Sequence, residues 1–312
     1  MTSHPMDPSA LQACLAGRYG LAVQRLEPFR DSGNATYIVH TCQQRYFLRV
    51  TKPAFHDTAL SALEVQIFLQ ERCFPVPRLI FALDGEPYIP LRADDGEYLL
   101  ALYELLEGTS LDPGQETERV GAMLGQLHTH MANYPGNLVT RGRHYFIDRF
   151  YDMLQAKRYP CIEAFTEIGE ALWESVKDLP RGYAHGDAYP GNFHRTSEGQ
   201  LYLLDLDTSC CGIPAYDLAL FGNRSDYFQL QPDHARRTQQ TFAGLLPAYR
   251  AFHPFPEGEE HALYRLIALS HFALQPTIVD IFGLDCIDEE FLDKQLLWHW
   301  QWQAQCEALH LW

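Results

Sequence analysis

Apolar and polar residues alternate along the N-terminal part of the chain, which is the pattern of half-buried strands. A helix is expected over residues 8–20. A second helix, capped by Asp57, would place Leu60, Leu63 and Ile67 on one apolar face. Strands are expected over residues 21–27, 36–42, 45–50, 78–82 and 98–103. The pattern predicts a five-stranded antiparallel sheet accompanied by a helix.

From Asp112 onward the apolar spacing changes to that of helices, beginning with Val120, Met123 and Leu127. Further helices are expected over residues 146–156, 161–178, 236–249, 259–274 and 289–309. The segment Glu104-Leu-Leu-Glu-Gly108 lies where the two patterns meet and is typical of a connector. The sequence therefore predicts an α+β fold of two lobes, with residues 1–104 forming the first and residues 105–312 a mostly helical second.

Charge and composition narrow the class of protein. The net charge of −16 disfavours a nucleic-acid partner, whose phosphates would be repelled. No apolar run approaches the ~18 residues that a membrane span needs, and the N-terminus carries no basic segment followed by an apolar one. The eight cysteines show no Cys-x-x-Cys pair, which is typical of reduced thiols. We expect a cytoplasmic protein without a membrane partner.

One stretch carries residues suited to phosphoryl transfer. Asp187 stands five residues before Asn192, and Asp205 ends the apolar run that begins at Leu201. This reaction needs a carboxylate that accepts the proton of an attacking hydroxyl, and an amide and a second carboxylate that hold Mg²⁺ against the phosphates. Asp187 is therefore the candidate base or hydroxyl-orienting residue, and Asn192 and Asp205 are the candidate metal ligands. The same residue types also form turns, but their order favours catalysis.

The phrase His185-Gly-Asp187-x-x-x-x-Asn192, followed by a strand ending in Asp205, resembles the signature of the aminoglycoside phosphotransferase and choline kinase superfamily. The segment Gly212-Ile-Pro-Ala-Tyr-Asp217 matches the segment that comes after this signature in that superfamily. The resemblance implies a bilobal protein-kinase-like fold, with ATP and Mg²⁺ as cofactors. His185 and Asp217 are then expected to support the catalytic loop. Asp207 is expected two residues further along the strand, either supporting the metal site or facing solvent.

The resemblance also implies a nucleotide site in the first lobe. The hairpin tip at Ser32, Gly33 and Asn34 matches the loop that covers the phosphates. Arg49 stands where kinases place a phosphate-binding Lys, and Glu64 is the candidate partner on the next helix. Main-chain groups from Glu104 to Leu106 are expected to face adenine.

The phosphate acceptor is left open. Residues 179–192 resemble type II homoserine kinases, and Leu204-Asp-Leu-Asp207 is similar to bacterial stress-response kinases that phosphorylate protein Ser or Thr. We expect an ATP-dependent kinase acting on a hydroxyl of a small, amine-bearing compound: an amino alcohol, or a homoserine-like, choline-like or aminoglycoside molecule. A protein Ser/Thr kinase and a non-catalytic pseudokinase are the alternatives. The acceptor-site candidates are Asp226, Tyr227, Gln275 and Trp298.

Overall fold

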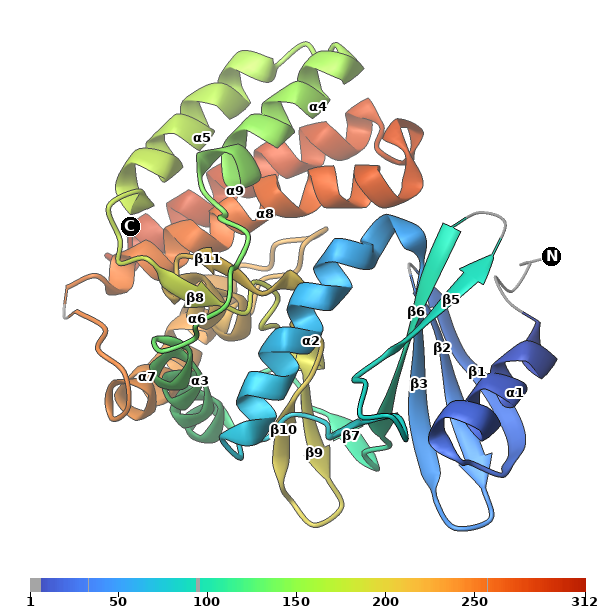
Figure 1. Cartoon of the computed structure of the whole chain (residues 1–312). Coiled ribbons are helices and arrows are strands. Elements are labelled where there is room, and N and C mark those ends of the chain that lie inside the picture. The colour runs from blue at the N-terminus through green and yellow to red at the C-terminus, as the bar shows by residue number, and fades with distance from the viewer. Residues whose placement is uncertain (1–6, 33, 94–95, 257) are drawn as a thin grey trace. The chain divides into compact units, whose positions relative to one another are not determined.

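The computed structural model describes residues 7–32, 34–93, 96–256 and 258–312. The chain folds into two compact units (Figure 1). The first unit comprises Met1–Ser110 and Phe193–Thr208, and the second comprises Leu111–Asn192 and Ser209–Trp312. The segment that carries Asp205 and Asp207 therefore belongs with the N-terminal sheet, although it comes after the catalytic loop in the sequence.

An antiparallel sheet forms the core of the first unit. Its strand order is β1 (Val23–Ser32), β2 (Asn34–Thr41), β3 (Arg45–Thr51), β6 (Gly96–Glu104) and β4 (Leu79–Ile80), and β5 (Ile89–Ala93) also pairs with β6. Over the described residues, the sheet thus has six strands where the sequence pattern predicted five. The strand that was missed contains Pro90, a residue that lacks a main-chain donor and usually argues against a strand interior.

Helices cover both faces of this sheet (Figure 1). On one face, Leu11 and Leu15 of α1 (Pro8–Tyr19) pack with inward residues of β2, β3 and β6. On the other face, Leu63 of α2 (His56–Glu71) packs with Ala101 of β6. The 3₁₀ turn Pro53–Phe55 precedes α2, and Phe55 occupies the N-cap position of this helix. The predicted cap was wrong, because Asp57 lies inside the first turn of α2.

A smaller sheet completes the first unit. It has the order β10 (Leu201–Leu203), β9 (Phe193–Thr196) and β7 (Gly108–Ser110), and the 3₁₀ turn η4 (Leu206–Thr208) comes directly after it. Gly108 permits a close approach of β7 to β9, since a Cβ there would lie 2.1 Å from the carbonyl oxygen of Arg195. This sheet brings the Asp205 segment back to the N-terminal unit.

The second unit is mostly helical, as the apolar spacing predicted. Its helices are α3 (Thr117–Met131), α4 (Arg149–Lys157), α5 (Ile162–Val176), α6 (Ala215–Gly222), α7 (His234–Arg250), α8 (Glu260–Phe282) and α9 (Glu289–Ala308). Shorter elements are the π-helical turn His144–Asp148, the 3₁₀ turns Pro190–Asn192 and Leu284–Cys286, and the strand pair β8 (Gly182–Ala184) and β11 (Cys210–Gly212). None of the helices in the described ranges is long and apolar enough to cross a bilayer.

Two glycines set the packing of α3 against α7. A Cβ added at Gly121 would lie 2.3 Å from the carbonyl oxygen of Leu245, and one added at Gly125 would lie 2.6 Å from that of Tyr249. No side chain fits at such distances, so the two helix backbones approach closely at these positions. This contact fixes His128, which stands one turn beyond Gly125 on α3, near Tyr249 of α7.

Candidate active site

The catalytic loop leaves β8 through a turn that requires glycine. Gly186 has φ +80°, in the left-handed region that a side chain disfavours. Upstream, Tyr183 and Ala184 pair with Cys211 and Cys210 of β11. The Gly in the His-Gly-Asp phrase is therefore a backbone requirement, because it turns the chain so that Asp187 comes directly after the strand.

Asp187 and Asn192 are brought together by the loop. The side-chain Nδ2 of Asn192 donates to the main-chain oxygen of Asp187 over 2.8 Å and to its Oδ2 over 2.9 Å. Only 7% of Asn192 is exposed. Because a carboxylate only accepts, the Asn192 amide presents its nitrogen to Asp187 and turns its Oδ1 the other way.

Asp217, at the start of α6, hydrogen-bonds the main chain of the same loop. Its carboxylate accepts from the main-chain N–H of His185 over 2.6 Å and from that of Gly186 over 2.8 Å. Asp217 is completely buried and also lies 3.0 Å from Nε2 of His128, whose Nδ1 is 2.8 Å from the Tyr249 hydroxyl. His128 thus contacts the side chains of both Asp217 and Tyr249.

His185 points into the protein. It is 0% exposed, and its Nδ1 accepts from the N–H of Asp187 over 3.2 Å. The side chain therefore braces the loop that presents Asp187.

In the first unit, Arg49 of β3 binds the acidic segment after β10. Its Nη1 donates to Oδ1 of Asp207 over 2.8 Å, its Nη2 donates to Oδ2 of the same carboxylate, and Nη1 lies 3.7 Å from Asp205. The strand ends at Leu203, Asp205 adopts φ +58°, and Asp207 lies in the turn η4. The prediction that Asp207 continues the strand was wrong, and its side chain is bonded to Arg49 rather than open to solvent.

The register of the sheet explains this pairing. Arg49 is aligned with Thr36 and Ala101, so it faces α2, while the flanking Leu48 and Val50 face α1. Burial would lower the pKa of Arg49, but the charges of Asp207 and Asp205 outweigh it and the pKa is raised. Within the described ranges, the ion pairs of Arg49 are with these two acids, and Glu64 on α2 is not among them.

The other nucleotide-site candidates are described to different extents. Gly33 and the side chain of Ser32 lie outside the described residues. Asn34 accepts the N–H of Lys52 through its Oδ1 over 3.3 Å. In the connector, the N–H of Glu104 donates to the carbonyl oxygen of Arg78 over 2.9 Å. Burial lowers the pKa of His194, and the main chain of Leu106 opposes this shift.

The four acceptor-site candidates meet in one network. The indole Nε1 of Trp298 donates to the Asp226 carbonyl over 2.9 Å. Gln295 links the other two, since its Nε2 donates to the Tyr227 carbonyl over 2.8 Å and its Oε1 accepts from Gln275 over 3.2 Å. Trp298 is 2% exposed and borders a hollow of about 750 Å³ shared with Phe228 and Phe291.

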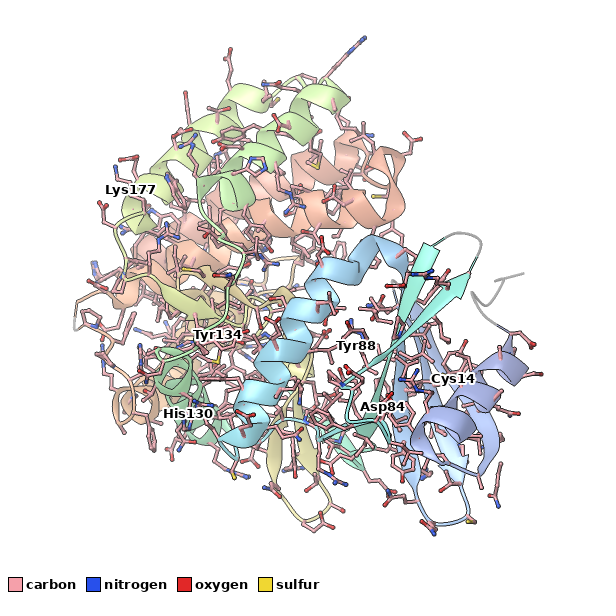
Figure 2. All side chains as sticks on the ribbon, viewed as in Figure 1. Cys14, Asp84, Tyr88, His130, Tyr134 and Lys177 are labelled. Carbon is pink, nitrogen blue, oxygen red and sulfur yellow. The ribbon has the colours of Figure 1, made fainter. Side chains whose placement is uncertain are left out.

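A cluster of Arg141, Tyr145 and Arg149 was missed by sequence reasoning. The Arg141 guanidinium lies 4.2 Å from the ring centre of Tyr145, and that of Arg149 lies 5.3 Å from it. Burial raises the pKa of Tyr145. The charges of Arg141 and Arg149 oppose this rise, and the charge of Asp187 adds to it. These residues come after the end of α3, where Figure 2 labels His130 and Tyr134. These positions show no periodic spacing of apolar residues, so only the local mixture of Arg and aromatic residues distinguishes them in the sequence.

An antiparallel sheet flanked by α1 and α2, followed by a mostly helical unit, defines a protein-kinase-like fold. The chain belongs to the phosphotransferase enzyme family, whose model matches residues 25–255. It is accordingly a kinase whose acceptor is a hydroxyl group.

Relatives and solved structures agree with this assignment. A homoserine kinase from Hyphomonas neptunium is 24% identical over 74% of this chain and 73% of its own length. An amicoumacin kinase, solved with AMP-PNP, Ca²⁺ and amicoumacin, superposes with a TM-score of 0.76 at 16% identity, covering 96% of this chain and 94% of that one. A microcompartment-associated aminopropanol kinase superposes with a TM-score of 0.73 at 18% identity, covering 95% of each chain. At these identities the two structures establish the fold.

Proposed function

We propose that the protein transfers the γ-phosphate of ATP to a hydroxyl of a small molecule, with Asp187 as the residue that orients the hydroxyl and accepts its proton. Residues 1–104 would bind the nucleotide, and residues 105–312 would carry catalysis and the acceptor. The observation that carries this proposal is the Asn192–Asp187 pair, since the 2.9 Å bond fixes the carboxylate in one orientation. Asp217 holds the preceding N–H groups, so the loop is organised before any substrate arrives.

The donor set fits a magnesium ion. Mg²⁺ prefers oxygen ligands and is bound in kinases by one or two protein groups together with phosphate oxygens. Asn192 turns its Oδ1 away from Asp187, and the Asp205 side chain is 50% exposed. We propose these two residues as the ligands. The bound ion would neutralise charge that develops on the transferred phosphate.

The nucleotide contacts are proposed from the first unit. Asn34, beside Ser32 and Gly33, would lie against the phosphates, and Arg49 would reach them while held by Asp207. Glu64 would support this site from α2. The N–H of Glu104 is committed to Arg78, so adenine recognition would fall to the other main-chain groups from Glu104 to Leu106.

A small-molecule acceptor is supported by the similar proteins, which are a homoserine kinase, an amicoumacin kinase and an aminopropanol kinase. The network of Asp226, Tyr227, Gln275 and Trp298 is our proposed wall for the acceptor. The hydrogen bond between Asn192 and Asp187 favours a catalytic protein over a pseudokinase that only binds nucleotide.

Replacement of Asp187 by Asn tests the catalytic proposal. Loss of the base should slow ADP formation by about a hundredfold or more, while calorimetry should show ATP binding within about threefold of the wild type, because the amide keeps the shape of the side chain. Asp178→Asn, an exposed position ahead of the same strand, is the control and should keep full activity. A rate for Asp187→Asn close to that of the wild type would remove Asp187 from the mechanism.

A further inference from the structure

Two arginines surround Tyr145, whose pKa is also raised by the charge of Asp187. Arg141 and Arg149 both lie over the ring of Tyr145, at 4.2 and 5.3 Å. Arg141 also acts on the hydroxyl of Tyr216. Burial raises the pKa of Tyr216, the charges of Tyr145 and Asp187 add to the rise, and Arg141 opposes it. Arg141 and Asp187 therefore act on the same two tyrosines.

The backbone of Arg141 is tied to the strands that carry the catalytic loop. Its N–H donates to the Cys211 carbonyl over 3.0 Å, and Thr140 forms a bridge with the same residue. Cys211 in turn pairs with Tyr183 of β8, which leads directly to His185 and Asp187. The position of Arg141 is thus set by the same small sheet that sets the position of Asp187.

Arg141 lacks an anionic partner among the described residues. Its Nη1 is buried and makes no hydrogen bond within the described part of the chain. The nearby Cys210 does not neutralise it, because burial raises the pKa of that thiol to about 12 against the opposing charge of Arg141. The two neighbouring arginines are different: Arg143 binds Glu170 over 2.5 and 2.8 Å, and Arg149 binds Asp280 over 2.6 Å.

A buried guanidinium nitrogen without an acceptor is costly, so native structures usually provide one from protein, water or ligand. The planar fork of arginine matches a carboxylate in two-point fashion. We propose, on the basis of the proposed function, that the acceptor is a hydroxylated carboxylic acid, such as a hydroxy amino acid, and that Arg141 binds its carboxylate. Arg141 is then a specificity-determining residue.

Matched pairs of compounds isolate the carboxylate. Homoserine, threonine and serine each have a decarboxylated counterpart that keeps the hydroxyl and the amine: two aminopropanols and ethanolamine. Hydroxybutanoate provides the reverse case, since it lacks only the amine of homoserine. Each compound is assayed for ATP-dependent phosphorylation, and its binding to the protein with AMP-PNP and Mg²⁺ is measured by calorimetry.

We expect the carboxylate-bearing member of a pair to bind and react better. Arg141→Gln should raise its KM and Kd by about ten- to a hundredfold, the range for loss of a charged hydrogen bond. The same variant should leave the KM for ATP and the weaker binding of the amino alcohol unchanged. Arg143→Gln, two residues along and already paired with Glu170, is the matched control and should change neither value.

The outcomes separate this inference from the proposed function. Preference for the amino alcohols, or an equal effect of Arg141→Gln on both members of a pair, overturns the carboxylate site and leaves the kinase intact. Carboxylate binding that depends on Arg141 supports the site even where turnover is slow. If calorimetry shows that the carboxylic acid and its amino alcohol bind the wild type equally well, the carboxylate site is overturned without any assay of activity.

Discussion

The guanidinium of Arg49 and the carboxylate of Asp207 form a two-point ion pair, with Nη1 donating to Oδ1 over 2.8 Å and Nη2 donating to Oδ2. Both side chains are about four-fifths shielded, with 20% and 22% of their areas exposed. Burial raises the pKa of Asp207. The charge of Arg49 opposes this rise, and the charge of Asp205 adds to it. The presence of Arg instead of Lys at this position is explained by this geometry, because only a planar fork makes both bonds.

Substitution of Arg49 should therefore affect stability. Arg49→Lys should lower the free energy of unfolding by about 1 kcal/mol, the value of one hydrogen bond. Arg49→Met should lower it by about 3 kcal/mol, since Asp207 is left as a shielded carboxylate without its partner. Urea unfolding measures both. Arg18→Lys, in a surface pair with Asp84 whose members are 41% and 50% exposed, should cost less than about 0.5 kcal/mol. Equal losses for Arg49→Met and Arg18→Lys would contradict this prediction.

Asp217→Asn should damage the catalytic loop without touching substrate. The new amide would turn its NH₂ toward one of the two N–H donors of His185 and Gly186, so one buried bond is replaced by opposed donors. We expect a loss of about 3 kcal/mol in unfolding free energy and a fall in kcat that exceeds any change in KM for ATP. The control is Asp233→Asn, a half-exposed residue that flanks α7. A wild-type kcat in the Asp217 variant would show that the loop does not depend on this carboxylate.

His271 should make the protein less stable in mild acid. Burial lowers its pKa from 6.5 to about 4, against the bond from its Nδ1 to Gln295 over 2.8 Å. Between these two values the unfolded chain binds a proton that the folded chain does not, so the free energy of unfolding falls as pH drops from 6.5 toward 4. The loss is on the order of 3 kcal/mol for this group.

The variant His271→Phe tests this directly, because a ring is retained against Trp298, whose ring centre lies 3.8 Å from that of His271. We expect melting temperatures measured from pH 7 to pH 5 to fall less steeply in this variant than in the wild type. Some slope should remain, since burial also lowers the pKa of His299 well below 6.5. Exposed His144 provides the control substitution, His144→Gln, which should keep the full slope. An unchanged slope in His271→Phe would exclude His271 as its source.

Two Gly→Ala variants should have opposite effects. Gly121→Ala places a methyl group 2.3 Å from the Leu245 carbonyl oxygen and should cost about 1–3 kcal/mol through overpacking of α3 against α7. Gly17→Ala, inside α1, adds a carbon with no described atom within 4 Å apart from its chain neighbours and its own helix backbone, and should stabilise by up to about 1 kcal/mol. Chemical unfolding of the two variants is sufficient to compare them, and a neutral Gly121→Ala would show that the helices can move apart.

Local pattern predicted most of the elements and the loop residues, because periodicity and the His-Gly-Asp phrase are written in neighbouring positions. It failed where a long-range partner decides. The strand ends at Leu203, and Asp207 lies in the following turn, where it binds Arg49, a residue far away in sequence. Arg141 shows the same limit, since its place beside Tyr145 depends on its bond to Cys211. The assigned roles of Asp187, Asn192 and Asp205 stay predictions for experiment.

The left-handed backbone of Asp205, with φ +58°, restricts which amino acids can stand there. Asparagine enters this conformation more readily than most residues with a side chain, whereas alanine gains nothing from it and β-branched residues are strained. Asp205→Asn is therefore the replacement that removes the charge and leaves the chain path intact. An alanine at the same position would mix a lost ligand with a disturbed main chain, and a dead enzyme obtained that way would say little about metal binding.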